Sequence, residues 1–422
     1  MKKALLLLFL PFFAFLVQCS EKDDDHGKAV LSDETSFNPL AIRRAAYVQA
    51  VWGDSATIRW VSSRITQRSY VKYGTSPDSL TQHAEAKILK HLNGRMNEAV
   101  LHDLAPQQKY YYAYYTNDSL FHEENLENQY FISNTAHPNA AFSFFAMGDI
   151  GEPFEKGGFP EFTAERIVFE EPDINFGLGL GDIVYPHGGS EDADKNLFAP
   201  MKSLLERAPM YCILGNHDWE TDPEQNFKKE WVLPQNRNYY HFTYGNTLFI
   251  GLDSKFGFFH EFQQQKDWLE ATLKQFQGKY DWTVVMVHHN GYSCTYKATY
   301  LRVVELYPIL AAYDVDLLLN GHAHTYERLH PFNEKGEPIK SYMPNIKQYP
   351  HIKNGFIPIT LGAGGKLERT YVPRPENCGR PIVAHARHRG HYGIFRIEGK
   401  NLHFSAHESL TGRKFDEFVM RK

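Results

Sequence analysis

A series of apolar runs beyond residue 140, each ending in a loop of glycine and polar residues, constrains the fold more than any other feature. In order they read FSFFAMGDIG, INFGLGLGDIVY, MYCILGNHDW, LFIGLDS, VVMVHHN and LLLNGHAHTYE. Continuous apolar runs are typical of strands buried on both faces. Between them lie helix-like stretches such as 262–276, with apolar residues at Trp268, Leu269, Leu273 and Phe276. Strands that alternate with helices predict an α/β domain, which we place at residues 140–422.

The preceding segment has a different texture. Short alternating stretches such as ATIRWVS, SYVKYG and KYYYAYY are separated by turn-rich pieces such as GTSPDS. Alternation with a period of two residues and closely spaced turns predicts a small all-β sandwich, which we place at 41–136. The polar residues 20–40 are typical of a tether.

The first 19 residues have the pattern of an export signal. Lys2 and Lys3 precede an apolar run from Ala4 to Val17, which is too short for a comfortable transmembrane helix. The stretch LVQC resembles a bacterial lipobox, in which Cys19 would carry the lipid. A plain signal peptide or an uncleaved anchor are the alternatives. We therefore expect an exported protein, periplasmic or on the outer membrane or cell surface, with membrane attachment only through Cys19.

Composition excludes some classes of function. The 422 residues carry a net charge of −5, which argues against binding to nucleic acid or anionic membranes through bulk electrostatics. A local cationic centre could still attract an anionic substrate. The chain has 4 cysteines. Cys212 lies in a strand pattern and is expected to be a core thiol, whereas pairing of Cys294 with Cys378 stays open.

The ends of the predicted strands carry the chemistry. In open α/β sheets, sites form at the carboxyl ends of the strands. These ends hold Asp149, Asp182, Tyr185, Asn216, His217, His288, His289, His322 and His324. Carboxylates, an amide oxygen, a phenol and imidazoles suit iron, manganese or zinc. The potential ligands exceed what one ion needs, so the economical interpretation is two ions bridged by a carboxylate, roughly 3.5–4 Å apart as in other two-metal sites.

Five motifs connect these residues with a known family. GDIG (148–151), GDIVY (181–185), GNHD (215–218), VMVH (285–288) and GHAH (321–324) resemble, in order, the motifs of purple acid phosphatases, which are calcineurin-like metallophosphoesterases. The tyrosine three residues after Asp182 distinguishes this family from its relatives. VWGDSATIRWVS, VKYGTSPDSL and LHDLAPQQKYYYAYY resemble the family's fibronectin-III-like N-terminal domain. The resemblance covers about residues 41–410 and implies a catalytic domain built as a two-layered β-sandwich flanked by helices.

The resemblance also implies a ligand set. Asp149, Asp182, Tyr185 and His324 would bind a ferric ion. Asp182, Asn216, His288 and His322 would bind a divalent zinc, manganese or iron ion, with Asp182 as the bridge. His217 has no ion to bind in this assignment, and we expect it to contact the phosphate and protonate the leaving oxygen.

The implied reaction is hydrolysis of a phosphate monoester of the acid phosphatase type, by a hydroxide that bridges the two ions. Many family members place a further histidine in the loop after VxxH. Here only His289 is directly adjacent, and Lys297 could supply positive charge, although a solvated surface lysine is the simpler interpretation. The basic segment HARHRGH (385–391) could line the pocket or form a solvated loop.

Other functions remain open alternatives. The same two-metal chemistry could act on phosphodiesters or nucleotides. A surface protein that binds a partner through its β domain, with a vestigial metal site, is an alternative of another class. We expect a small phosphate ester as the substrate and no nucleic-acid partner.

The stretch NGHAHTY allows one geometric prediction. Side chains two residues apart on an extended segment point to the same side, so His322 and His324 would reach one cavity while Ala323 turns away.

Overall fold

The computed structural model describes residues 42–121, 126–236, 238–255, 259–295, 297, 299–343, 345–368 and 382–422. The leader, the tether, Cys19 and Cys378 lie outside these residues, so the predictions made for them are not tested. Cys212 is a buried free thiol, as predicted. Cys294 is disulfide-bonded, and its partner lies outside the described part of the chain. Within that part, no helix has the length and apolar character needed to cross a bilayer.

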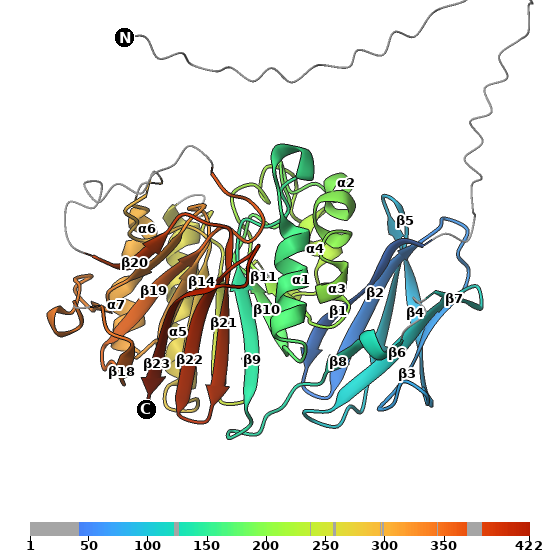
Figure 1. The fold of residues 1–422 in the computed structure, drawn as a ribbon, viewed down its shortest axis with the longest axis horizontal. Helices are drawn as coiled ribbons and strands as arrows, with labels where there is room; N and C mark the ends of the chain where they lie inside the picture. The colour runs from blue at the N-terminus through green and yellow to red at the C-terminus, as the bar shows by residue number, and fades with distance from the viewer. Residues whose placement is uncertain are drawn as a thin grey trace, which may run out of the picture. The chain divides into compact units, whose positions relative to one another are not determined.

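The N-terminal segment forms the all-β domain that its alternating pattern predicts. Its strands are β1 (Ile42–Trp52), β2 (Ser55–Ser62), β3 (Ser69–Gly74), β4 (Gln82–His91), β5 (Gly94–Leu101), β6 (Lys109–Thr116), β7 (Ser119–Phe121) and β8 (Tyr130–Ile132), with the turn η1 (Leu126–Asn128) before β8. The first half of β4 pairs with β3 and its second half pairs with β5. Strand β4 therefore passes from one layer to the other (Figure 1). The inward-facing side chains of the two layers enclose a single core around Trp60, Tyr112 and Phe131.

Two mixed sheets form the catalytic domain. One has the order β11 (Met210–Cys212), β10 (Phe176–Gly179), β9 (Phe142–Met147), β21 (His391–Glu398), β22 (Asn401–Glu408), β23 (Lys414–Arg421) and β18 (Gln348–Pro350). The other has the order β12 (Tyr240–Tyr244), β13 (Thr247–Leu252), β14 (Trp282–Val287), β15 (Leu317–Asn320), β19 (Gly355–Leu361), β16 (Tyr326–Leu329) and β20 (Val383–Arg387), and β17 (Phe332–Asn333) pairs with β19.

The predicted apolar runs are the parallel strands of these two sheets. Strand β10 pairs in parallel with β9 and β11, and β14 pairs in parallel with β13 and β15. Side chains from both sheets meet in one aromatic core: the ring of Phe144 stacks on Phe176 and Phe395 at 5.2 and 4.7 Å and meets Phe249 edge-on at 5.3 Å. Rings packed in this way stabilise the contact beyond the area that they bury. The predicted fold class is confirmed.

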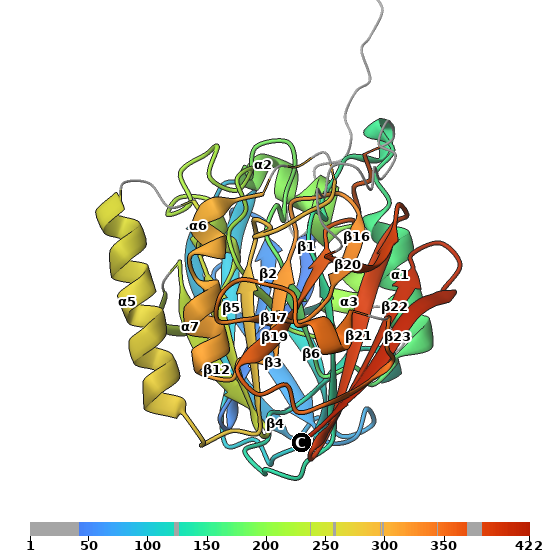
Figure 2. The same ribbon diagram turned by 90° about the vertical axis from the view of Figure 1, so that its left-hand side faces the viewer.

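Helices cover the outer faces of this sandwich. The α-helices are α1 (Pro160–Glu170), α2 (Ser190–Ala193), α3 (Lys202–Leu205), α4 (Phe227–Glu230), α5 (Phe259–Phe276), α6 (Leu301–Val304) and α7 (Tyr307–Ala312), and the remaining turns are η2 (Phe154–Lys156), η3 (Asp194–Phe198), η4 (Pro234–Asn236) and η5 (Lys340–Tyr342). The helix-like stretch 262–276 is most of α5, which buries Leu269 and Leu273 against the sheet that contains β13. Figure 2 shows α5, α6 and α7 on one side of the two sheets and α1 on the other.

Candidate metal centre

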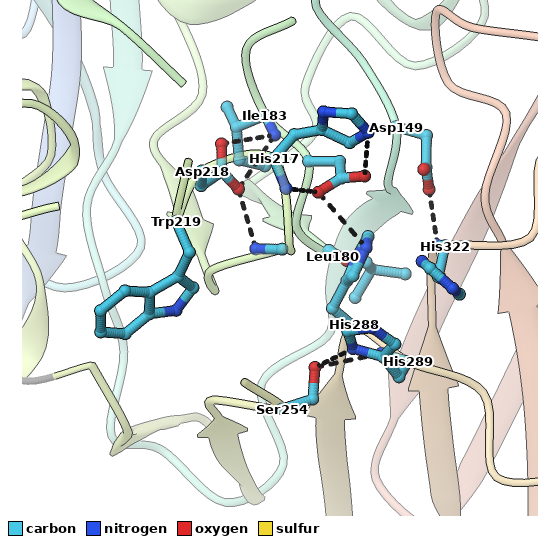
Figure 3. A network of polar contacts seen from close by, with 12 residues as sticks. Asp149, Leu180, Ile183, His217, Asp218, Trp219, Ser254, His288, His289 and His322 are labelled. Atoms are coloured by element: carbon cyan, nitrogen blue, oxygen red, sulfur yellow. Dashed lines mark hydrogen bonds and ion pairs between the residues drawn. The ribbon is translucent and has the colours of Figure 1, made fainter. Parts of the chain in front are cut away.

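The loops that follow five parallel strands bring the predicted ligands together. Asp149 follows β9, Asp182 follows β10, Asn216 follows β11, His288 follows β14, and His322 follows β15. Parallel strands end at the same edge of their sheet, and the two sheets present these edges to one another. The polar network in Figure 3 therefore contains side chains that lie up to 173 residues apart in the sequence, such as Asp149 and His322.

One group of side chains surrounds the phenol of Tyr185. Its hydroxyl oxygen lies 2.9 Å from Oδ1 of Asp149, 2.9 Å from Oδ2 of Asp182 and 3.3 Å from Nε2 of His324. His324 Nε2 also lies 3.1 Å from Oδ1 of Asp149. The single hydroxyl hydrogen of Tyr185 cannot bond to both carboxylates at once. Three oxygens and one nitrogen therefore lie close together with too few hydrogens between them, and a cation bound at that point would relieve their repulsion. These four residues are the ones expected to hold the ferric ion.

A second group lies on the other side of Asp182. Ligand atoms of Asp182, His288 and His322 all lie within 4.8 Å of one another. Nε2 of His288, Nδ1 of His322 and Oδ1 of Asn216 are buried and have no hydrogen-bond partner among the described residues. Buried polar atoms without partners are costly, and a divalent ion would satisfy all three. The four residues expected to hold this ion therefore fit it, with Asp182 shared by both groups.

Backbone carbonyls fix the ring orientation of two histidines. Nδ1 of His288 donates to the carbonyl oxygen of Leu180 at 2.7 Å, which turns Nε2 toward Asp182 Oδ1 at 3.4 Å. Nδ1 of His217 donates to the carbonyl oxygen of Pro186 at 2.7 Å, which leaves Nε2 4.0 Å from Oδ2 of Asp182. A carbonyl cannot donate, so these bonds set the tautomers, as is usual around metal-binding histidines.

Burial and neighbouring charges control the protonation of these groups. Burial and the carboxylates of Asp149 and Asp182 raise the pKa of the Tyr185 phenol well above its usual value. Formation of a phenolate there would need a positive charge close by. Burial favours the neutral acid at Asp182, but His288 and His217 outweigh it and lower its pKa. Burial and His288 lower the pKa of His322, which favours the neutral imidazole that metals bind.

The segment around His322 corrects the predicted geometry. His322 has a φ of 66°, and the amides of Ala323 and Thr325 bond to the carbonyls two residues earlier at 2.8 and 2.6 Å. The backbone is therefore tightly turned, and the prediction of an extended segment is wrong. Both imidazoles still face the site, because the amide of His322 bonds to Oδ2 of Asp149 at 2.7 Å and anchors the turn.

Asp218 is a structural residue of the site that the sequence did not reveal. Its buried carboxylate accepts the amides of Ile183 at 3.0 Å and Gly215 at 2.8 Å. It thereby joins the loop that carries Asp182 to the loop that carries Asn216. Gly215 is required for this approach, because a Cβ there would lie 2.1 Å from the amide nitrogen of Asp182. The only sequence signal was the position of Asp218 in the motif GNHD.

His289 lies beside the second group, and Lys297 acts on it electrostatically. His289 bonds through Nδ1 to Oγ of Ser254 at 2.7 Å, and its ring centroid lies 4.2 Å from that of His322. Lys297 is partly buried, and its charge contributes to lowering the pKa of both histidines. Lys297 is therefore partly exposed, rather than the fully solvated residue that the simpler interpretation of the sequence expected.

The segment HARHRGH does not form a solvated loop throughout. His385 and Arg387 lie in strand β20, and His391 is buried at the start of β21. Arg389 pairs with Glu408 at 3.0 Å. Lys366, which the sequence did not single out, lies closer to the candidate ligands: its Nζ is 3.6 Å from the ring centroid of Tyr185 and 2.9 Å from Oε2 of Glu152.

Comparison with known proteins agrees with this geometry. Residues 142–326 match the family described as calcineurin-like phosphoesterase, and residues 45–129 match the purple acid phosphatase N-terminal domain. The chain thus joins a calcineurin-like phosphoesterase domain to an N-terminal domain like that of purple acid phosphatases. It is a phosphatase, a hydrolase with a metallophosphoesterase domain.

Purple acid phosphatases and a related phosphatase align along most of the chain. Purple acid phosphatase 18 of Arabidopsis thaliana is 23% identical over 407 residues, which cover 89% of this chain and 85% of the relative. Phosphoenolpyruvate phosphatase of Allium cepa is 24% identical, with 75% and 68% covered. The purple acid phosphatase from yellow lupin seeds has the same fold, with a TM-score of 0.73 at 18% identity over 89% of this chain and 74% of that one.

Proposed function

We propose that this protein hydrolyses phosphate monoesters at a dinuclear centre of one ferric and one divalent ion. The observation that carries the proposal is the shared carboxylate of Asp182, which lies 2.9 Å from the Tyr185 hydroxyl on one side and 3.4 Å from His288 Nε2 on the other. The group around Tyr185 is rich in oxygen and suits a trivalent ion. The group around His288 offers imidazoles and an amide, which suit zinc, manganese or ferrous iron.

Bound ions of this kind neutralise phosphate charge and activate water as the nucleophile. The protein's own side chains would orient the ester and supply the proton. His217 is partly exposed, and its Nδ1 lies 3.0 Å from Oε1 of Glu220. With Nδ1 held by Pro186 and Glu220, the imidazolium form presents an Nε2–H that can donate to the leaving oxygen. Lys297 and His289 line the same site and would bind the phosphate oxygens.

A chain like this would act on a small soluble ester outside the cytoplasm, since the leader predicts export. One relative, from Allium cepa, is a phosphoenolpyruvate phosphatase, which makes small anionic monoesters reasonable first substrates. No nucleic-acid partner is part of the proposal, because the net charge is −5. Attachment to a membrane would involve only Cys19.

The decisive experiment combines metal analysis with visible absorption. We expect two ions per chain, one of them iron, and a tyrosinate-to-iron band that disappears in Tyr185→Phe while the far-UV circular dichroism is unchanged. A colourless, active protein with two zinc or manganese ions would refute the ferric assignment and leave phosphate hydrolysis intact. A metal-loaded protein that cleaves no phosphate ester would favour the vestigial-site alternative.

Substrate class needs its own comparison. We expect a higher kcat/KM for p-nitrophenyl phosphate than for bis-p-nitrophenyl phosphate, because a monoester presents more free oxygens to two ions and Lys297. A preference for the diester would replace the monoesterase proposal with the phosphodiesterase alternative.

A further inference from the structure

A buried ion cluster joins the N-terminal domain to the catalytic domain. Arg44 of β1 is only 4% exposed. Its Nε pairs with Oδ1 of Asp194, and its Nη1 pairs with Oε2 of Glu230. The guanidinium carbon lies 3.7 Å from the ring centroid of Phe198. One side chain of the N-terminal domain therefore holds two acids of the catalytic domain at once.

Further side chains of the N-terminal domain complete the cluster. Nδ2 of Asn93 donates to Oδ2 of Asp194 at 2.6 Å. His91 Nε2 lies 3.0 Å from Oε1 of Glu230, and the Tyr47 hydroxyl donates to the Glu230 carbonyl oxygen at 3.0 Å. Each carboxylate thus has a partner on both oxygens, which is the arrangement that a buried charge needs.

The two acids lie on the segments that follow two of the metal-binding loops. Asp194 begins η3, a π-helical turn in the connection after Asp182–Tyr185. In the same turn, Nδ2 of Asn196 donates to the carbonyl oxygen of Tyr185 at 2.8 Å. Glu230 ends α4, in the connection after Asn216–Asp218. The ion cluster is therefore a short distance along the chain from both loops.

These connections have little intrinsic stability of their own. Helices α3 and α4 have 4 residues each, and α2 continues directly into η3 to give one short helix over Ser190–Phe198. Isolated helices shorter than ~12 residues are at best marginally stable in water. Their positions depend on tertiary contacts, of which the amide of Ser190 with Oδ1 of Asn226 at 3.1 Å is one that joins the two connections. Arg44 holds both connections through charge.

We propose that the N-terminal domain positions the metal-binding loops, with Arg44 as the positioning residue that fixes the two connections through Asp194 and Glu230. The path to the centre runs from Arg44 through Asp194 and the η3 turn to Asn196 and the backbone of Tyr185. A second path runs through Glu230 and α4 to the loop of Asn216. The inference rests on the proposed function, because it concerns the residues assigned to the two ions.

The alternative is that the cluster only joins the domains. A purely structural contact would lower the thermal stability of the whole chain when it is broken, without a particular effect on the metal-binding loops. Amide hydrogen exchange in metal-free protein separates the two, because the amides of Ile183 and Gly215 report on these loops through their bonds to Asp218.

The test uses the full-length protein and isosteric variants, since Arg44→Ala could fail to fold. Asp194→Asn and Glu230→Gln each break one arm of the cluster, and Glu85→Gln is the control. Glu85 pairs with Arg68 at 2.9 Å, and the other ion pair of Arg68, with Asp118, also lies within the N-terminal domain. We expect the Ile183 and Gly215 amides to exchange at least tenfold faster in both cluster variants, and at an unchanged rate in the control.

Metal release provides the second readout. After loading, we expect Asp194→Asn and Glu230→Gln to lose ions to a chelator at least tenfold faster than wild type, and Glu85→Gln to match wild type. Exchange rates in the two loops equal to those of the control, with only a lower Tm, would overturn the positioning role. Failure of the proposed function would show separately, as wild-type protein without two ions or phosphatase activity, and the exchange measurement would still decide the coupling.

Discussion

The ammonium group of Lys366 lies over the ring of Tyr185, 3.6 Å from its centroid. A cation over a phenol stabilises the ring's negative charge and more so when the ring is a phenolate. Lys366→Met removes this positive charge. The loss raises the energy of the electrons on the nearby ring more than it changes an ion bound at the phenol oxygen. We expect the tyrosinate-to-iron absorption band of the iron-loaded protein to move to longer wavelength. Lys366→Arg should keep the band in place, and an unchanged band in Lys366→Met would contradict the interpretation.

His322 and His324 should control different ions. His322 belongs with Asp182 and His288, whereas His324 lies 3.3 Å from the Tyr185 hydroxyl. We expect His322→Ala to lose the divalent ion and keep its colour, and His324→Ala to lose iron and its colour. Elemental analysis of both proteins measures this. His289→Ala is the control and should retain both ions, since its Nδ1 bonds to Ser254. Parallel loss of both ions in each variant would argue for a single cooperative site.

Asp218→Asn tests the link between two of the loops. An amide cannot accept as many backbone N–H groups as the carboxylate does, so a buried donor would lose its partner. We expect the free energy of unfolding to fall by about 1–3 kcal/mol, and the metal content to fall with it. Denaturant titration of the metal-free protein measures the first effect. Asp222→Asn is the same substitution at an exposed acceptor of a single amide, that of Glu224, whose bond the asparagine oxygen can keep, so it should change little. Equal effects of the two substitutions would show that Asp218 has no special role.

Glu327 should make stability depend on pH. Burial raises its pKa from 4.5 to about 7, although Ser293 and the amide of Cys294 donate to it. The pKa of Glu327 is higher in the folded protein than in the unfolded chain. Its contribution to the free energy of unfolding is therefore fully present below pH 4.5 and is lost as pH rises through 7. The shift corresponds to about 3 kcal/mol.

The measurement is the free energy of unfolding of metal-free protein between pH 4 and pH 8. Glu327→Gln should reduce this slope, because its side chain does not titrate, while the raised pKa values of Asp253 and Asp316 leave part of the slope in place. Glu334→Gln, at an exposed position, should keep it. Equal slopes in wild type and Glu327→Gln would show that Glu327 is ionised without penalty in the folded protein.

The strands and the candidate ligands could be predicted because both are local patterns. Apolar runs that end in glycine and polar residues indicate buried parallel strands, and parallel strands bring their ends to one edge. The conformation after the strand could not be predicted in this way. His322 has a left-handed backbone, where the periodicity of an extended segment does not apply.

Contacts between residues that lie far apart in the sequence could not be predicted either. Arg44 and Glu230 lie 186 residues apart, and each alone is an ordinary charged residue of a strand or helix. Lys366 follows a glycine-rich loop with nothing to indicate that its chain would turn toward Tyr185. Such pairs depend on how the sheets and domains pack, which one sequence does not encode in any short pattern.

Three of the candidate ligands, Asp149, Asp182 and His322, have φ values of 57°, 49° and 66°. Side-chain-bearing residues in this conformation cost about 1 kcal/mol or more each unless their surroundings enforce it. A short peptide that carries the same motif would relax and lose the geometry. Anyone who wished to transfer this centre to another scaffold would therefore have to transfer the strand ends and the carboxylate of Asp218 along with the ligands.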